Sequence, residues 1–170
     1  SPDSAEVRAV PTAAPEPAVG DVKVEYRTSD TNASDNQIRF NLRLTNHGTE
    51  AVNLSDVKVR YYYTVEGGQS QEFHCDYAAV GSGNVRGTFV PLSGAVAGAD
   101  HYLEISFASG AGTLEPGANS GDIQIRVNKS DWSNYNESDD FSYDSTKTSY
   151  TEWEKTPLYL NNTLIWGLEP

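Results

Sequence analysis

An alternation of apolar and polar residues with a period of two is the feature that most restricts the fold of this chain. Because successive side chains of a β-strand point to opposite faces, each alternating run is typical of a strand with one buried face. No run of ten or more residues has the spacing of an amphipathic helix. The alternating runs cover residues 22–26, 38–44, 57–63, 103–107 and 123–127, and a last strand pair is expected around Leu158 to Trp166.

Turn-forming sequences separate these runs. They are Asn46-His47-Gly48, Gly67-Gly68, Gly81-Ser82-Gly83 and Pro116-Gly117. Several short strands divided by such turns favour an antiparallel sandwich over a parallel sheet with connecting helices. We therefore predict an all-β fold, an antiparallel β-sandwich with jelly-roll topology.

The beginning of the chain has a different composition from the rest. Residues 1–20 contain four of the eight prolines, with alanine and serine between them and no apolar period. Such a composition is typical of a semi-extended linker, and a linker here implies a further domain upstream. We expect residues 21–170 to form one folded domain, a normal size for a single core.

The charge of the chain excludes some classes of partner. Twelve basic residues stand against 24 acidic ones, a net charge of -12, so no basic patch for nucleic acid is expected. The sequence contains no run of 18 or more apolar residues, so no membrane span is expected, and we recognise no intact signal peptide in it. Cys75 is the single cysteine, which excludes an intramolecular disulfide.

A tryptophan among polar residues suggests a binding surface. If the apolar residues of 123–127 face inward, Gln124, Arg126 and Asn128 project from the outer face of that strand, and Trp132 follows in the loop. An exposed indole can stack on a pyranose ring while neighbouring polar groups bind its hydroxyls. The alternative is that Trp132 only caps the end of the sandwich.

Eight segments, in order along the chain, resemble family 3 carbohydrate-binding modules, the cellulose-binding modules of bacterial cellulases and scaffoldins. The segments are VKVEY (22–26), NLSDVKVRYYYTV (53–65), CDYAAVGSGNV (75–85), GTFV (87–90), YLEISF (102–107), GTLEPG (112–117), KSDWSNYN (129–136) and YLNNTLIWGLEP (159–170). The resemblance covers about 21–170. It implies a jelly roll of about nine strands, one structural calcium ion and a flat strip that adsorbs to cellulose.

The resemblance also implies which residues form that strip. Asp76, Tyr77, Arg126 and Trp132 match its members, and Gln124 lies beside them in the sequence pattern. A bidentate carboxylate–guanidinium pair is planar, so Asp76 and Arg126 can extend the flat surface; an ordinary surface ion pair is the alternative.

One aromatic member of the strip has no counterpart here. Family members that bind strongly carry a tyrosine in an insertion between the positions of Ala79 and Asn84, where this chain has only Val80-Gly81-Ser82-Gly83. We therefore expect a strip shorter by one stacking unit. Losing one aromatic contact, on the order of 1 kcal/mol, would weaken affinity several-fold without abolishing binding.

A group of oxygen ligands follows Trp132. Asn136, Asp139 and Asp140 suit calcium but form too short a motif to be diagnostic, and a solvated acidic turn is the alternative. The resemblance completes the shell with Thr64 and with Glu66, which replaces the usual aspartate. We expect the ion to have a structural role.

A second surface is also implied by the resemblance. Arg60, Tyr62, Tyr102 and Glu104 match an outward-facing shallow groove on the opposite face of such modules. A linker peptide and a sugar both remain open as its ligand.

The expected function is a non-catalytic module that targets an attached glycoside hydrolase or scaffold to plant cell-wall polysaccharide, with cellulose or a related β-glucan as partner. An accessory or sensory module with weak or altered glycan binding is the first alternative. A β-sandwich glycosidase is the second, but no pair of carboxylates occurs in a recognisable cleft motif. We expect a secreted bacterial protein that is monomeric.

Overall fold

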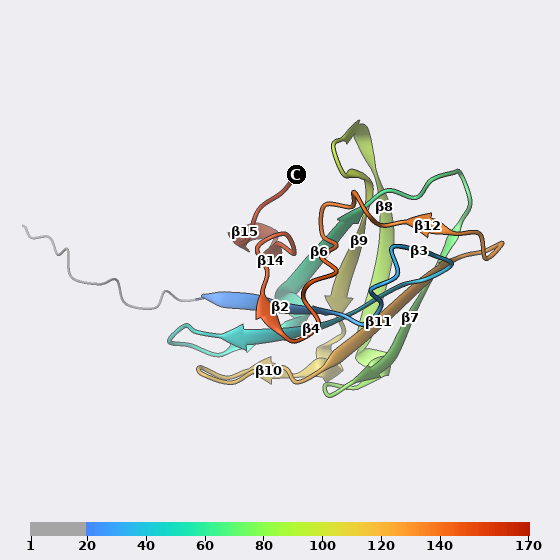
Figure 1. Cartoon of the computed structure of the whole chain (residues 1–170). Helices are drawn as coiled ribbons and strands as arrows, with labels where there is room; N and C mark the ends of the chain where they lie inside the picture. Colours follow the sequence, from blue (N-terminus) through green and yellow to red (C-terminus); the bar gives the residue numbers. More distant parts are fainter. Residues whose placement is uncertain (1–19) are drawn as a thin grey trace, which may run out of the picture.

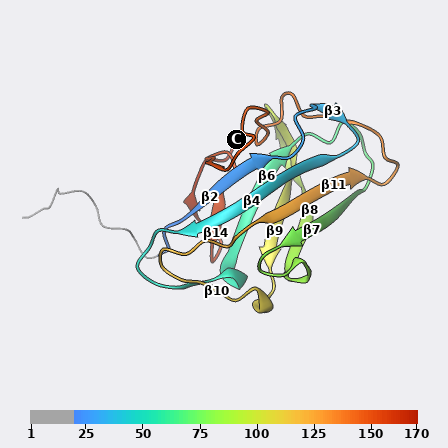
Figure 2. The same cartoon turned by 60° about the horizontal axis from the view of Figure 1, so that its bottom comes forward.

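Two antiparallel sheets of five strands each pack face to face in the computed structural model, which describes residues 20–170 (Figures 1 and 2). The first sheet has the order β13 (Thr151–Glu152), β2 (Val22–Thr28), β4 (Ile38–Asn46), β11 (Ile123–Lys129) and β7 (Gln71–Ala78). The second has the order β15 (Thr163–Trp166), β14 (Leu158–Leu160), β6 (Val57–Tyr63), β9 (Ala99–Phe107) and β8 (Val85–Val96).

Short elements complete the fold at the ends of the sandwich. Strands β3 (Ser34–Asp35) and β12 (Tyr135–Asn136) pair with each other, as do β5 (Val52–Asn53) and β10 (Thr113–Leu114). Residues 20–170 contain three short 3₁₀ turns, η2 (Leu54–Asp56), η3 (Ser82–Asn84) and η4 (Ser109–Ala111). None of the helical turns within residues 20–170 has the length and apolarity needed to cross a bilayer.

The alternating residues of both sheets form the core. In β2 and β11 every second residue from Val22 and from Ile123 is fully covered, as the period of two predicts. Aromatic rings fill the centre: Phe40 and Tyr61 come from opposite sheets and stack with ring centroids 4.2 Å apart. The two sheets bury each other's inner faces without a covering helix.

The chain crosses between the sheets repeatedly, from β4 to β6, from β6 to β7, from β7 to β8 and from β9 to β11. This confirms the predicted antiparallel sandwich of jelly-roll type. The expected number of about nine strands is close to the ten strands of the two main sheets. The predicted linker, residues 1–20, lies outside the described residues except for Gly20.

Strands β7 and β8 show no clear alternation, and both lie at the edge of a sheet. Pro91 interrupts β8, as is common in edge strands. Gly87 is required there because a Cβ atom at this position would lie 2.3 Å from the ring of Phe73 in β7. Strand β7 pairs directly with β11, so its side chains lie next to those of β11.

Candidate functional site

A β-bulge in strand β7 determines how Asp76 and Tyr77 are displayed. Cys75 pairs with Ile125 and Tyr77 pairs with Gln124, so Asp76 is an extra residue without a partner in β11. Neighbouring residues of a regular strand would point to opposite faces. The bulge leaves both Asp76 and Tyr77 exposed, and Tyr77 has 51% of its surface accessible.

Asp76 forms a bidentate ion pair with Arg126. The Nε and Nη2 atoms of Arg126 donate to the two carboxylate oxygens of Asp76, each over 3.0 Å. The guanidinium holds the pKa of Asp76 below its ordinary value through these hydrogen bonds. The two side chains therefore form a planar ion pair without net charge next to Tyr77.

Gln124 and Arg126 have neighbours on both sides in the sheet. Gln124 lies between Tyr77 of β7 and Asn41 of β4, and Arg126 lies between His74 and Arg39. Sequence reasoning did not select His74, Arg39 or Asn41 for this face. The alternation of 38–44 would have indicated the last two, because they occupy the polar positions of that strand.

Asn128 differs from the expectation that it projects to solvent. It lies on the outer side of β11 by parity but is fully covered, because its amide nitrogen donates to Glu72 over 3.1 Å and its oxygen contacts the ring nitrogen of His74 at 3.0 Å. Glu72, opposite Asn128 in the neighbouring strand, is the partner that holds it. Asn128 thus supports the face and does not belong to its exposed row.

Trp132 is held away from the core by a tight turn. Its φ is +60°, which is rare for a large residue, and its N–H donates to the carbonyl of Lys129 over 3.0 Å. The carboxylate of Asp131 accepts bonds from the N–H and the hydroxyl of Ser133 at 3.1 and 2.7 Å. Trp132 remains 47% exposed, so it does not cap the interior of the sandwich.

A polar hollow lies directly beside the ion pair. Its lining includes Arg27, Arg39, Asn41, Asp76 and Gln124. These groups offer donors and acceptors within a sheet face that also carries Tyr77. The arrangement supplies both hydrogen bonding and ring stacking.

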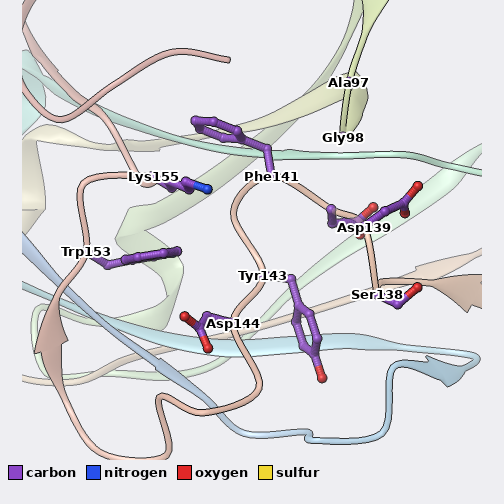
Figure 3. A pocket seen from close by; sticks show the side chains of 10 residues that line it. Ala97, Gly98, Ser138, Asp139, Phe141, Tyr143, Asp144, Trp153 and Lys155 are labelled. Carbon is purple, nitrogen blue, oxygen red and sulfur yellow. The ribbon is translucent and has the colours of Figure 1, made fainter.

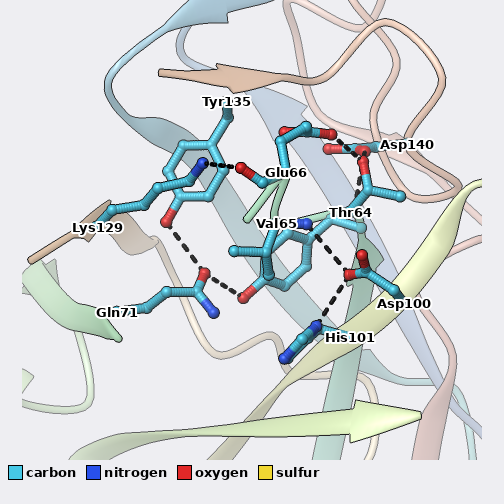
Figure 4. Close-up of polar contacts among 10 residues, drawn as sticks. Thr64, Val65, Glu66, Gln71, Asp100, His101, Lys129, Tyr135 and Asp140 are labelled. Carbon is cyan, nitrogen blue, oxygen red and sulfur yellow. Dashed lines mark hydrogen bonds and ion pairs between the residues drawn. The ribbon is translucent and has the colours of Figure 1, made fainter. Parts of the chain in front are cut away.

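The predicted metal ligands Thr64, Glu66 and Asp140 gather at the end of β6 (Figure 4). The Thr64 hydroxyl forms a hydrogen bond of 2.8 Å with the Asp140 carboxylate, and it also lies within hydrogen-bond distance of the Glu66 carboxylate. One oxygen from each of Glu66, Asp139 and Asp140 lies within 4.8 Å of the others. This donor set is of the oxygen type that calcium prefers.

Asp140 brings a buried carboxylate oxygen without a hydrogen-bond partner into this cluster. It is 5% exposed, and its Oδ2 atom has no hydrogen-bond partner. Burial raises its pKa to about 8, and the carboxylates of Glu66 and Asp139 act in the same direction. A buried, unpaired carboxylate oxygen directed at other oxygen ligands fits a cation.

Asn136 reaches this cluster through its backbone. Its N–H donates to the Glu66 carboxylate over 2.8 Å. Its side-chain oxygen instead accepts from the N–H and hydroxyl of Ser138 at 3.1 and 2.6 Å. The expected ligand oxygen of Asn136 is therefore engaged in a local turn.

Lys129 connects the metal-ligand cluster with the Trp132 turn. The residue is 1% exposed, and its ammonium group donates to the carbonyls of Glu66 and Asn134 at 3.1 and 2.9 Å. Its own carbonyl receives the Trp132 N–H. Sequence reasoning missed Lys129, although the alternation of 123–127 continues to this position and places it inward.

A hollow of about 570 Å³ borders the proposed metal ligands Asp139 and Asp140 and is lined further by Tyr143, Trp153 and Lys155 (Figure 3). Trp153 is held by the chain itself, because its indole N–H donates to the Ser142 carbonyl over 2.9 Å. Lys147 and Lys155 place their ammonium groups 4.4 and 5.7 Å from its ring centroid. Its ring is thus occupied by internal contacts and does not offer a free platform.

The structure brings the second predicted set together on β6 and β9. Arg60 lies opposite Glu104 and bonds to it over 3.3 Å, while Tyr62 lies opposite Tyr102. Tyr62 lies on the outer side of β6 and lines the groove with Arg60 and Tyr102, as expected, but neighbouring side chains cover it so that only 3% of it is exposed. The ring of Phe141 packs edge-on against it at 6.0 Å, and the groove is lined further by residues that follow β15, Glu169 and Pro170.

An exposed aromatic ring beside a planar ion pair, on the open face of a jelly-roll sandwich, is typical of a surface that binds glycans. A family model described as "Cellulose binding domain" matches residues 23–167. The chain therefore belongs to family 3 of the carbohydrate-binding modules, the family of cellulose-binding domains.

Known proteins support this membership. The chain is 50% identical over 151 residues to "Beta-mannanase/endoglucanase A" of Caldicellulosiruptor saccharolyticus, covering 89% of this chain and 11% of that protein. It is 46% identical over 160 residues to "Cellulosomal-scaffolding protein B" of Acetivibrio thermocellus, covering 89% and 20%. The chain thus spans only a small part of these relatives. The solved CBM3b of scaffoldin subunit ScaA from Acetivibrio cellulolyticus has a TM-score of 0.85 and 49% identity, with 88% and 97% covered.

Proposed function

We propose that this module binds cellulose or a related β-glucan through one row of side chains, the binding strip. The binding strip consists of Asp76, Tyr77, Gln124, Arg126 and Trp132. Its two rings would stack on the flat faces of glucose units, and its polar members would bind their hydroxyls. A stiff glucan in a crystal presents such faces on an open surface.

The bulge at Asp76 is the observation that carries this proposal. A regular strand would turn one of Asp76 and Tyr77 toward the core, whereas the bulge leaves both exposed. A bulge at an edge strand costs ladder hydrogen bonds, and its effect here is to place the ion pair beside the ring. Functional use of the outer face explains this departure from regular pairing.

Residues 79–84 explain why the binding strip has two rings. The N–H of Gly81 donates to the Ala78 carbonyl and that of Asn84 to the Gly81 carbonyl, which closes the segment into a tight turn. No aromatic residue is present between Ala79 and Asn84 to extend the row. We therefore propose that affinity is several-fold lower than in a module with a third ring.

The biological role follows from the linkage of such modules to other domains. We propose that residues 21–170 are the binding module and that residues 1–20 are the linker to a hydrolase or scaffold, which the module holds at the polysaccharide surface. Its relatives are bacterial cellulase and cellulosomal scaffold proteins, and we propose that this module is likewise secreted and that it acts as a monomer.

We further propose that Thr64, Glu66, Asp139 and Asp140 hold a structural Ca²⁺ ion. The bound ion would neutralise the carboxylates. The backbone of Asn136 fixes Glu66, and Lys129 fixes the carbonyl of the same residue. Together these contacts would join the loop after Trp132 to the end of β6.

For the second groove we propose a structural role. The guanidinium of Arg60 lies 4.3 and 4.2 Å from the rings of Tyr102 and Tyr159 and 3.6 Å from Glu169. These contacts support docking of the segment after β15 onto the outer face of the second sheet.

A depletion assay on microcrystalline cellulose tests the binding proposal. Trp132→Ala should bind cellulose several-fold more weakly than the wild type, and more of it should therefore stay in solution, because one ring of the binding strip is removed. Tyr102→Ala on the other sheet is the matched control and should bind as the wild type does. Equal depletion of the wild type and Trp132→Ala would contradict the proposal and favour an accessory or sensory role. Turnover of a soluble glucan by the chain would contradict a non-catalytic module.

A further inference from the structure

A second cluster of carboxylates involves the segment just before Asp139 and Asp140. One oxygen from each of Asp30, Asp35 and Glu137 lies within 4.8 Å of the others. Asp30 follows β2, Asp35 ends β3, and Glu137 directly follows β12. None of these residues belongs to the binding strip or to the proposed calcium site.

Two oxygens in this cluster are buried without a hydrogen-bond partner. Glu137 is 1% exposed and its Oε2 atom has no hydrogen-bond partner. The Oδ2 atom of Asp30 also accepts no hydrogen bond, although it lies 3.6 Å from the Arg39 guanidinium. An isolated buried carboxylate is strongly unfavourable unless a cation or a proton compensates it.

The protein supplies only part of the compensating charge. Among the described residues, Arg39 is the one cation in an ion pair with the cluster: its Nη2 atom lies 3.6 Å from Asp30, and its side chain is 44% exposed. This single, largely solvated guanidinium does not form an ion pair with Asp35 or Glu137. A net negative charge therefore remains at a buried position.

The geometry of the loops prepares the cluster for a ligand. One oxygen of Asp30 accepts the N–H of Asn32 over 2.9 Å, and one oxygen of Asp35 accepts the N–H of Gln37 over 3.2 Å. The Glu137 N–H donates to the Ala33 carbonyl over 2.7 Å, which fixes the two loops against each other. The carboxylates of Asp30 and Asp35 are thus oriented by backbone N–H groups of their own segment, and the backbone of Glu137 is fixed against that segment.

We propose that Asp30, Asp35 and Glu137 form a second cation site, which takes a hard divalent ion such as Ca²⁺. Calcium–oxygen distances of about 2.3 to 2.6 Å place ligand oxygens up to about 5 Å apart, which agrees with the separation in the cluster. A hollow lined by Thr31, Ala33, Ser138 and Tyr143 borders the same loops, and water from it can complete the shell.

The two clusters share one loop but use different residues of it. Glu137 belongs to the proposed second site, whereas Asp139 and Asp140 belong to the first. The N–H of Asp140 donates to the carbonyl of Glu137 over 2.9 Å. An ion at the second site would tie this loop to the β2–β3 connection.

Calcium binding to chelator-treated protein, measured by isothermal titration calorimetry, tests the second site. The wild type should bind two ions. Glu137→Gln and Asp35→Asn should each bind one ion fewer. Asp140→Asn, which removes a ligand of the first site, is the comparison variant and should also bind one ion. In the Asp140→Asn background, the single remaining ion should disappear with Asp35→Asn. If the first site binds no calcium, the wild type should bind one ion, and Glu137→Gln and Asp35→Asn should bind none. The second site is therefore tested independently of the first.

Thermal denaturation separates loss of the ion from loss of the fold. In chelator, Glu137→Gln should melt at or above the wild-type temperature, because it removes a buried charge, and calcium should then raise its melting temperature less than that of the wild type. Should Glu137→Gln not fold, the half-buried Asp35→Asn gives the same comparison. Wild-type stoichiometry in both variants would overturn the proposal and would mean that protons neutralise the cluster.

Discussion

At the scale of single residues, the surface depends on a few side chains whose neighbours fix their direction. Asp76 is directed by the bulge and held by Arg126 through two bonds of 3.0 Å. Trp132 is held outward by a turn with φ of +60°. The motif resemblance predicted these residues. The bulge itself could not be predicted, because it depends on pairing between β7 and β11 and not on either strand alone.

The planar geometry of the ion pair is testable by a charge-conserving change. Arg126→Lys keeps the positive charge but loses the two parallel N–H donors, so cellulose adsorption should fall several-fold while the melting temperature stays within a few degrees. Adsorption isotherms measure the effect. Unchanged adsorption would mean that only the charge of Arg126 matters.

The ion pair also predicts a pH dependence. Arg126 lowers the pKa of Asp76 below 3.8, so the pair is fully formed above that value and is lost as the pH falls through the lowered pKa. Adsorption should therefore be constant from neutral pH down to about 4 and should weaken below this. Asp76→Asn should remove the acidic transition, and a wild-type transition near neutral pH would contradict this assignment.

Lys129 provides a test of how the two loops are joined. Lys129→Met keeps the buried stem but removes the donor to the carbonyls of Glu66 and Asn134, which should cost about 1–3 kcal/mol in the free energy of unfolding. Urea denaturation measures this. The exposed Lys58→Met is a matched control, and equal stability of the two variants would show that the Lys129 bonds contribute nothing.

At the scale of elements, the period of two identified the strands with one buried face. It located β2, β4, β6, β9 and β11 and the final pair, all of which contribute to the core. It did not identify β7 and β8, because edge strands have less of their surface covered and because the bulge and Pro91 break the period. Those strands include the one that carries Tyr77.

The loop between β12 and β13 shows a further limit of sequence reasoning. Asn136, Asp139 and Asp140 were selected as oxygen ligands, but the sequence could not show that the Asn136 side chain would bond to Ser138. Glu137 was not selected, because a glutamate next to other polar residues usually lies in solvent. Its burial results from pairing of β3 with β12, segments about 100 residues apart.

Removal of calcium should destabilise the folded chain. An ion that binds only the folded state contributes about 2.7 kcal/mol at 100 times its dissociation constant, so excess chelator should lower the melting temperature by several degrees. Asp140→Asn should show a smaller shift than the wild type. An identical melting curve with and without chelator would contradict the proposed metal sites.

At the scale of the whole molecule, the sandwich works as a rigid support with different uses for its two outer faces. The first sheet carries most of the proposed binding strip, and the second contacts the segment after β15. Charged residues are common on the surface, yet the binding strip neutralises its own charges through the Asp76–Arg126 pair. An uncharged, crystalline glucan is the type of ligand that suits such a face.

The most direct test of the central claim is an adsorption isotherm on crystalline cellulose for Tyr77→Ala, Trp132→Ala and the double variant. The account predicts that each single change weakens adsorption by about 1 kcal/mol or more, that the double variant loses nearly all adsorption, and that circular dichroism remains that of the wild type. Wild-type adsorption by a folded double variant would show that cellulose binds elsewhere on the molecule.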